Sequence, residues 1–127
     1  MNEIKSRTLK GTVFSGFGVA TGSLRPHMRA IRTQTGLPNL VEGTLNLRLH
    51  DGSYSGHPDY IFQKGHYNQN EDTYFERCRI QGMPALIMRT STNAHGHGVL
   101  ELMGEVKFRD QLNLKDGDSL EVEVFDP

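Results

Sequence analysis

The sequence predicts a single all-β (mainly β) domain, closed or nearly closed into a barrel, and three observations support this fold class. The chain has 127 residues, which suits one domain spanning 1–127. Its 14 glycines recur between short apolar runs, a spacing typical of short strands joined by turns. Roughly six or seven such runs, with one or two short helices, favour a barrel because closure removes the exposed edges of a small sheet.

The clearest strand lies at 44–49, where three leucines alternate with Thr44, Asn46 and Arg48. A short helix is expected at 26–35, because Pro26 suits a first helical turn and Gly36 suits a helix end. A second short helix is expected near residues 107–112. The remaining apolar runs predict strands at 8–15, 60–63, 73–80, 83–89, 99–103 and 119–125.

Composition excludes several classes of protein. With 14 basic and 15 acidic residues the net charge is −1, so the basic excess of a duplex-binding protein is missing and no nucleic-acid partner is expected. Cys78 is the single cysteine, which excludes an intramolecular disulfide and a cysteine-based zinc site. No segment approaches the ~18 apolar residues of a membrane span, and the N-terminus has no apolar signal region. We therefore expect a cytoplasmic protein without a membrane partner.

Two polar residues of the 44–49 strand form a candidate metal site. Thr44 and Asn46 are two apart, so their side chains point to the same side of a strand. A hydroxyl and an amide carbonyl are hard oxygen donors, which Mg²⁺ prefers, and phosphates often complete its coordination. The same spacing also fits an ordinary polar face on a half-buried strand.

A glycine-containing loop and three arginines are candidate phosphate-binding features. The loop at 16–22 follows a predicted strand, and glycine lets backbone N–H groups approach phosphates closely. It has neither the Walker nor the Rossmann spacing, so an ordinary turn also explains it. Arg25, Arg29 and Arg32 share one face of a helix, where they can meet phosphates or simply face solvent.

Glu101 stands between apolar neighbours in the segment VLELM. A carboxylate there either points outward from an edge strand or accepts a hydrogen bond, for example from the hydroxyls of a ligand. His95 and His97 are spaced loosely in a glycine-rich segment, which favours a flexible loop over a metal site. Cys78 falls within a strand pattern and is expected in the core.

Taken together, three stretches resemble the CTP-dependent riboflavin kinase family, best known from archaea. The first is KGTVFSGFG at 10–18, similar to the opening strand and glycine loop of the family. The second is Gly36-Leu37-Pro38 followed by EGTLNL at 42–47, which resembles the Gly-Thr-Leu-Asn strand that is the family's most specific motif. The third comprises ALIMR at 85–89 and VLELMGEVKFRDQLNLKDGDSLEVEV at 99–124. The resemblance spans nearly the whole chain.

The resemblance implies a six-stranded cradle-loop barrel that transfers the γ-phosphate of CTP to the 5′-hydroxyl of riboflavin, giving FMN and CDP. It implies Mg²⁺ as cofactor, held by Thr44 and Asn46. It places the flavin on Glu101 and on a loop threonine, for which Thr92 is the candidate, although an ungapped alignment gives Asn93. The implied nucleotide-binding residues are Phe17, Gly18, Val19, Ala20, Thr21, Gly22, Val106, Lys107, Phe108 and Arg109.

The glycine loop departs from the family pattern. The family has Gly-x-Gly-Glu-Gly, whereas this chain has Gly16-Phe17-Gly18-Val19-Ala20. Alanine hinders backbone conformations that glycine allows. This change leaves open a second interpretation, in which the barrel is a non-catalytic flavin- or nucleotide-binding domain with a regulatory role.

Overall fold

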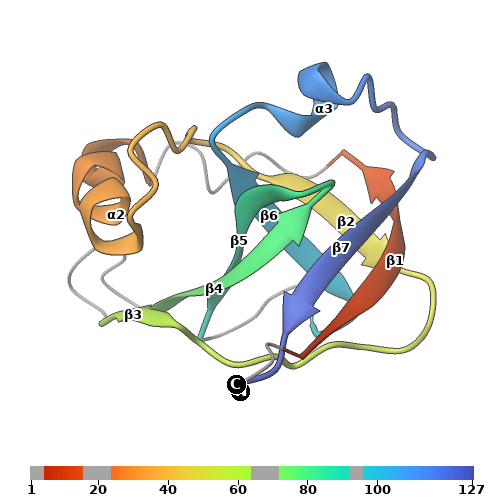
Figure 1. The fold of residues 1–127 in the computed structure, drawn as a ribbon, viewed down its shortest axis with the longest axis horizontal. Coiled ribbons are helices and arrows are strands. Elements are labelled where there is room, and N and C mark those ends of the chain that lie inside the picture. Colours follow the sequence, from red (N-terminus) through yellow and green to blue (C-terminus); the bar gives the residue numbers. More distant parts are fainter. Residues whose placement is uncertain (1–4, 16–23, 64–71, 92–95) are drawn as a thin grey trace.

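The computed structural model describes residues 5–15, 24–63, 72–91 and 96–127. Figure 1 shows a sheet that curves round on itself, with helix α2 outside it and helix α3 at one end. The helical segments are η1 (Arg25–His27), α2 (Met28–Thr35) and α3 (Phe108–Gln111). The strands are β1 (Ser6–Phe14), β2 (Leu45–Leu49), β3 (Tyr60–Phe62), β4 (Thr73–Ile80), β5 (Met83–Thr90), β6 (Val99–Gly104) and β7 (Ser119–Phe125).

Six antiparallel strands close the barrel. The sheet order is β3-β4-β5-β6-β2-β1-β7, and a further pairing of β7 with β4 closes the ring. The short β3 lies outside this ring and shares one edge of β4 with β7, since β3 pairs with Thr73–Phe75 and β7 with Cys78 and Arg79. The prediction of a mainly β, closed six-stranded barrel with two short helices is therefore confirmed.

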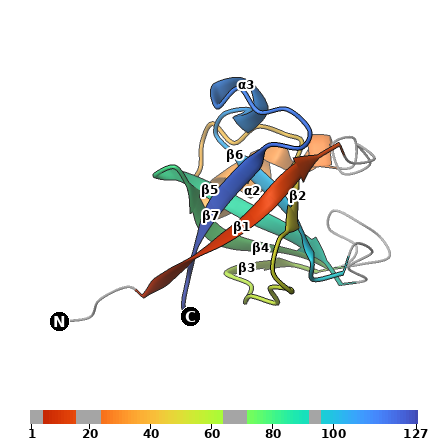
Figure 2. The ribbon, with the colours of Figure 1, turned by 90° about the vertical axis from the view of Figure 1, so that its right-hand side faces the viewer.

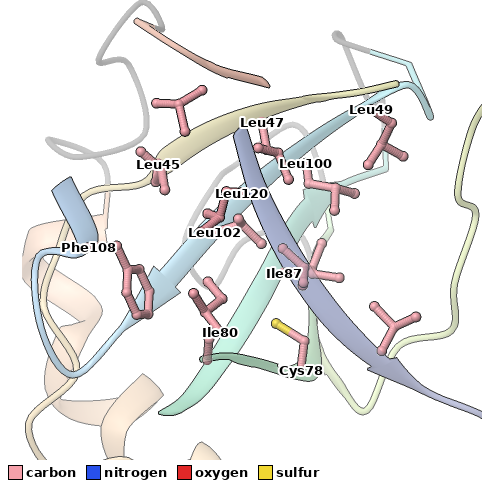
Figure 3. Close-up of a cluster of buried hydrophobic side chains, with 14 of the residues drawn as sticks. Leu45, Leu47, Leu49, Cys78, Ile80, Ile87, Leu100, Leu102, Phe108 and Leu120 are labelled. Carbon is pink, nitrogen blue, oxygen red and sulfur yellow. The ribbon is translucent and has the colours of Figure 1, made fainter. Parts of the chain in front are cut away.

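Alternation along the strands divides the apolar side chains between two sides of the barrel wall. The inner core fills the barrel with leucines, isoleucines and valines, and Figure 3 shows side chains from β2, β4, β5, β6 and β7 converging there. Cys78 belongs to this inner core, as predicted, and only 2% of it is exposed. An outer cluster covers part of the opposite side and consists of Leu24, Met28, Ile31, Leu40, Phe62, Phe75, Leu86, Met88 and Met103.

Local sequence signals explain where the helices lie. Pro26 occupies the first turn of η1, where a missing N–H is tolerated, and Gly36 ends α2 with a φ of 72°. Met28, Ile31 and Thr35 form the buried stripe of α2. Met28 and Ile31 join the outer cluster, so α2 is fixed to the outside of the wall beside β5.

Helix α3 marks one end of the barrel, and the start of β1 and the C-terminus mark the other. Figure 2 shows α3 at one end and the start of β1 with the C-terminus toward the other. Ser6 pairs with Phe125, so the beginning of β1 lies beside the end of β7. Phe108, the first residue of α3, is buried in the inner core and covers the barrel end. No helix in the described ranges is long and apolar enough to cross a membrane.

Candidate functional site

A cavity of about 370 Å³ opens at the barrel end that carries α3. Segment 41–45, which leads into β2, forms one side, and segment 102–104, at the end of β6, lies next to it because these strands pair. Residues 106–110, which include the start of α3, form the other side. Thr44 and the four predicted nucleotide-binding residues at 106–109 therefore line one cavity, although they lie far apart in the sequence.

Asn46 is buried on the outer side of the wall. Leu45, Leu47 and Leu49 point into the barrel, so alternation turns Asn46 the other way, yet only 7% of it is exposed. Its Oδ1 atom receives no hydrogen bond within the part of the chain that the structure describes. A buried carbonyl oxygen without a donor costs roughly 1–3 kcal/mol. An unpaired oxygen of this kind fits a cation or a ligand donor.

Glu101 is the direct cross-strand neighbour of Asn46. Residues Asn46 and Glu101 pair in register between β2 and β6, so their side chains leave the same side of the sheet roughly 4.5–5.5 Å apart at Cβ. Glu101 is half-buried, and β6 lies between β5 and β2 rather than at an edge. The interpretation of Glu101 as an exposed residue on an edge strand is therefore wrong.

A continuous row of side chains crosses the outer wall at this level. Strand registers place aromatic or sulfur-containing residues on both sides of the Asn46–Glu101 pair. The row runs Phe14, Asn46, Glu101, Met88 and Phe75. Its two polar members thus stand between flat or flexible apolar groups, an arrangement that suits an aromatic ligand with polar substituents.

Seven of the predicted ligand residues lie outside the described residues. They are Phe17, Gly18, Val19, Ala20, Thr21, Gly22 and Thr92. The strand that precedes the first six, β1, ends with Phe14 opposite Asn46. Their assignments stay predictions from the sequence.

Three of the four arginines proposed to meet phosphates are engaged with protein groups, and these are Arg25, Arg32 and Arg109. Arg109 lines the cavity, but its Nη2 donates to Asp116 Oδ1 at 2.6 Å. Hydrogen bonds from Ser15 and Arg109 lower the pKa of Asp116. Arg25 pairs with Glu42 at 3.0 Å, and this hydrogen-bonded carboxylate raises the arginine pKa.

Arg32 is likewise engaged, because its Nε donates to the carbonyl oxygen of Leu40 at 2.9 Å. The predicted stripe of arginines therefore serves partly to fix the segment between α2 and β2. His97 Nδ1 lies 2.9 Å from Ser55 Oγ, while His95 falls outside the described residues. In the described ranges no three His, Cys, Asp or Glu side chains gather as a metal site.

Sequence reasoning missed Gly104, which shapes the cavity. A Cβ atom on Gly104 would lie 2.3 Å from Cζ of Phe108, so only glycine lets the Phe108 ring pack there. The signal in the sequence was a glycine directly after the VLELM strand. A second cavity of about 600 Å³ lies elsewhere, between α2 and β4, and contains none of the predicted site residues.

Comparisons with known proteins identify the family of the chain. A family model named CTP-dep_RFKase, described as "Domain of unknown function DUF120", matches residues 13–124. The chain therefore belongs to this family, and the curated relatives that it matches are named riboflavin kinases.

Three named relatives illustrate the similarity. The riboflavin kinase of Archaeoglobus fulgidus is 32% identical over 92% of this chain and 54% of its own length. That of Pyrobaculum aerophilum is 33% identical over 96% of this chain and 62% of its own length. That of Ignicoccus hospitalis is 32% identical over 95% of this chain and 73% of its own length. The chain thus spans little more than half the length of several relatives.

Proposed function

We propose that this protein phosphorylates riboflavin, with CTP as the donor, to give FMN and CDP. The observation that carries this proposal is the buried Oδ1 atom of Asn46, which is unpaired within the described residues. Asn46 lies beside Glu101 and follows Leu45, which lines the cavity together with Thr44. A buried oxygen acceptor next to a carboxylate and a pocket is the arrangement that a metal–phosphate ligand would complete. Family membership supports the reaction class.

The residues present fit a magnesium ion. The Asn46 carbonyl oxygen and the Thr44 hydroxyl are hard donors, and Asn46 Oδ1 has no competing donor among the residues described. Thr44 and Asn46 would hold the ion. When bound there, Mg²⁺ would supply positive charge to the phosphate oxygens of the nucleotide.

The chain itself would mainly position the two substrates. The cavity formed by residues 41–45 and 106–110 would take the nucleotide, and Glu101 would accept a hydrogen bond from the ribityl hydroxyls. The 5′-oxygen of riboflavin then bonds to the γ-phosphorus while the bond from that phosphorus to the β–γ bridging oxygen breaks. CDP leaves with the bonding electron pair, and the hydroxyl proton passes to solvent.

The test combines purified protein with riboflavin, Mg²⁺ and either CTP or ATP, and follows FMN by chromatography. We expect FMN with CTP. Thr44→Ala and Asn46→Ala should each lower its formation by more than about 100-fold, because even outer-shell partners of a metal cost about 10–100-fold. The melting temperature of N46A should change little, since Asn46 Oδ1 makes no hydrogen bond to a described residue. Full activity in both variants would overturn the metal assignment.

A second candidate function is a non-catalytic flavin- or nucleotide-binding domain. Val19 and Ala20 in the glycine loop favour it, because they replace the acidic residue and a glycine of the family pattern. The same assay separates the two: flavin binding without FMN formation from either nucleotide would support the binding domain.

A further inference from the structure

Residues 39–42, which lead from α2 towards β2, are tied to the end of β6. The backbone N–H of Val41 donates to the carbonyl oxygen of Gly104 at 2.9 Å. The backbone N–H of Asn39 donates to Oε2 of Glu105 at 3.0 Å. Segment 39–42 therefore has a defined place at the wall of the cavity that opens beside α3.

Glu42, the last residue of this segment, brings a carboxylate to the cavity proposed to take the nucleotide. It lines this cavity two residues before Thr44. Of the two acidic residues among the described lining, Asp110 is exposed, whereas the Glu42 side chain is only 29% exposed. A half-buried charge is screened less by solvent than an exposed one. Without a partner, the Glu42 carboxylate would therefore repel the phosphates of a nucleotide.

Arg25 neutralises this carboxylate. Its Nε donates to both Oε1 and Oε2 of Glu42 at 3.1 Å, and its Nη2 lies 3.0 Å from Oε1. A guanidinium that contacts both oxygens of one carboxylate fixes its orientation as well as its charge. The described residues that line the cavity include Glu42 but not Arg25, so the arginine reaches the carboxylate from outside the cavity.

Stability gives little reason for this ion pair. The Arg25 side chain is 72% exposed, and pairs with so exposed a member contribute little to the free energy of folding. Arg77 forms a similar exposed pair with Asp59 at 3.9 Å, but neither of these residues lines the cavity. The place of the Arg25–Glu42 pair, at the wall of the proposed nucleotide cavity, therefore indicates a role in binding.

We propose that Arg25 is a positioning residue for nucleotide binding, which acts by neutralising Glu42 and holding its carboxylate at the cavity wall. Arg25 does not touch the nucleotide itself; it cancels a negative charge that would otherwise face the phosphates. This inference rests on the proposed function, because it needs a nucleotide in this cavity. It predicts that the loss of Arg25 weakens binding only through Glu42, and that neutralising Glu42 as well restores binding.

The experiment measures CTP binding by calorimetry in the presence of Mg²⁺ and without riboflavin. Arg25→Ala should weaken CTP binding by about 5–10-fold, because one pair of like charges about 5 Å apart in water already costs roughly 4-fold and the nucleotide carries more than one charge. The double variant R25A/E42Q should bind CTP within about 2-fold of wild type, and Glu42→Gln alone at least as tightly as wild type. The matched control is Arg77→Ala, which also leaves a carboxylate unpaired but lines the second cavity, and it should bind CTP within about 2-fold of wild type.

Salt separates an electrostatic effect from a structural one. Raising the salt concentration from about 0.1 M to about 1 M shortens the Debye length from about 10 Å to about 3 Å. The loss in R25A, relative to wild type in the same salt, should therefore shrink to about 2-fold or less at the higher concentration. A loss caused by displacement of segment 39–42 would persist there.

The outcomes distinguish this inference from the proposed function. Wild-type protein that binds no CTP overturns both. The Arg25 assignment alone is overturned if R25A binds CTP like wild type, if E42Q alone weakens binding, or if the loss in R25A persists in R25A/E42Q or in high salt. Recovery of CTP binding in R25A/E42Q, in a protein that forms no FMN from CTP or ATP, supports the assignment and overturns only the catalysis.

Discussion

At the scale of single residues, the site depends on residues whose side chains are unusual for the wall of a barrel. Asn46 places an amide on the outer side of β2, where it is 7% exposed, and its Oδ1 makes no hydrogen bond within the described chain. Such a group is a net cost to folding. Its presence is explained if a ligand compensates that cost in the bound state.

Gly104 is the second such position, and it yields a prediction about stability. Gly104→Ala would bring a Cβ atom to 2.3 Å from Phe108 Cζ, so the ring must shift out of its place in the inner core. We expect the free energy of unfolding to fall by about 1–3 kcal/mol, as for other overpacked cores. Because Phe108 lines the cavity, CTP binding measured by calorimetry should weaken as well.

Gly98→Ala is the matched control for this change. Its Cβ would lie 3.7 Å from the carbonyl oxygen of Gly52, an ordinary contact, and its φ is not in the left-handed region. Chemical denaturation should therefore give nearly the wild-type stability for G98A. Equal stability of G104A and G98A would show that the Phe108 ring is not confined as described.

At the scale of elements, α2 supplies much of the cover over the outer wall near the site. Ile31 is fully buried and packs with Met28, Leu86, Met88 and Met103 in the outer cluster. Met88 is also the neighbour of Glu101 across β5 and β6. The packing of α2 and the environment of Glu101 are therefore linked through one side chain.

Ile31→Ala should loosen this helix. We expect the free energy of unfolding to fall by about 2–5 kcal/mol, the usual cost of removing a buried isoleucine side chain. Gln34→Ala, on the exposed side of the same helix, should change it by no more than about 0.5 kcal/mol. Urea denaturation followed by circular dichroism measures both, and similar losses in the two variants would contradict the buried role of Ile31.

The same scale shows what the sequence could and could not predict. Strands Thr73–Ile80 and Ser119–Phe125 have the predicted bounds, because clear alternation and Gly-containing turns mark both of them. Local pattern also gave the C-terminal end of α2 and the burial of Cys78, whereas the helix expected at 26–35 divides into η1 and α2. For Thr44 and Asn46, local pattern predicted only that the two side chains point to the same side of a strand.

Strand order could not be predicted, because the pairing of β2 with β6 joins residues far apart in sequence. The meeting of Asn46 with Glu101, and the central position of β6, follow from that pairing alone. The Arg48 guanidinium stacks on the Phe14 ring, and this contact likewise depends on the register of β1 and β2. Sequence thus indicated the residue types of the site and a family, whereas topology determined which of them are neighbours.

At the scale of the whole molecule, a group of buried and half-buried polar residues lies among the apolar side chains inside the barrel. Tyr54 donates a hydrogen bond through its hydroxyl to Glu76, and Glu76 also accepts the backbone N–H of His57 at 3.1 Å. Arg89 donates to the carbonyl oxygen of Tyr54. Burial, and then the hydrogen bond to Glu76, raise the pKa of Tyr54. Burial also raises the pKa of Cys78, with the Glu76 charge adding to it.

These two shifts predict how stability depends on alkaline pH. A group whose pKa is higher in the folded than in the unfolded protein contributes its full stabilisation at any pH below the unfolded-state pKa. That contribution decreases as the pH rises towards the folded-state pKa. For Cys78 that loss begins near the thiol pKa of an unfolded chain, about 8.5, and for Tyr54 near about 10. The free energy of unfolding should therefore fall above about pH 8.5 and fall more steeply above about pH 10.

Cys78→Ala isolates the thiol contribution from that of every other titrating group. Between pH 8 and 10 the wild-type protein should lose about 2 kcal/mol more of its unfolding free energy than C78A, because only the wild-type unfolded chain releases a thiol proton in this range. Urea denaturation at each pH measures the unfolding free energy of both proteins. The slope of this free energy against pH is compared, because alanine also removes packing around a side chain that is only 2% exposed and so changes the absolute stability. Parallel curves for the two proteins would mean that the thiol ionises as readily inside the barrel as in water, and would contradict the burial of Cys78, which lies in β4 opposite Val124 of β7.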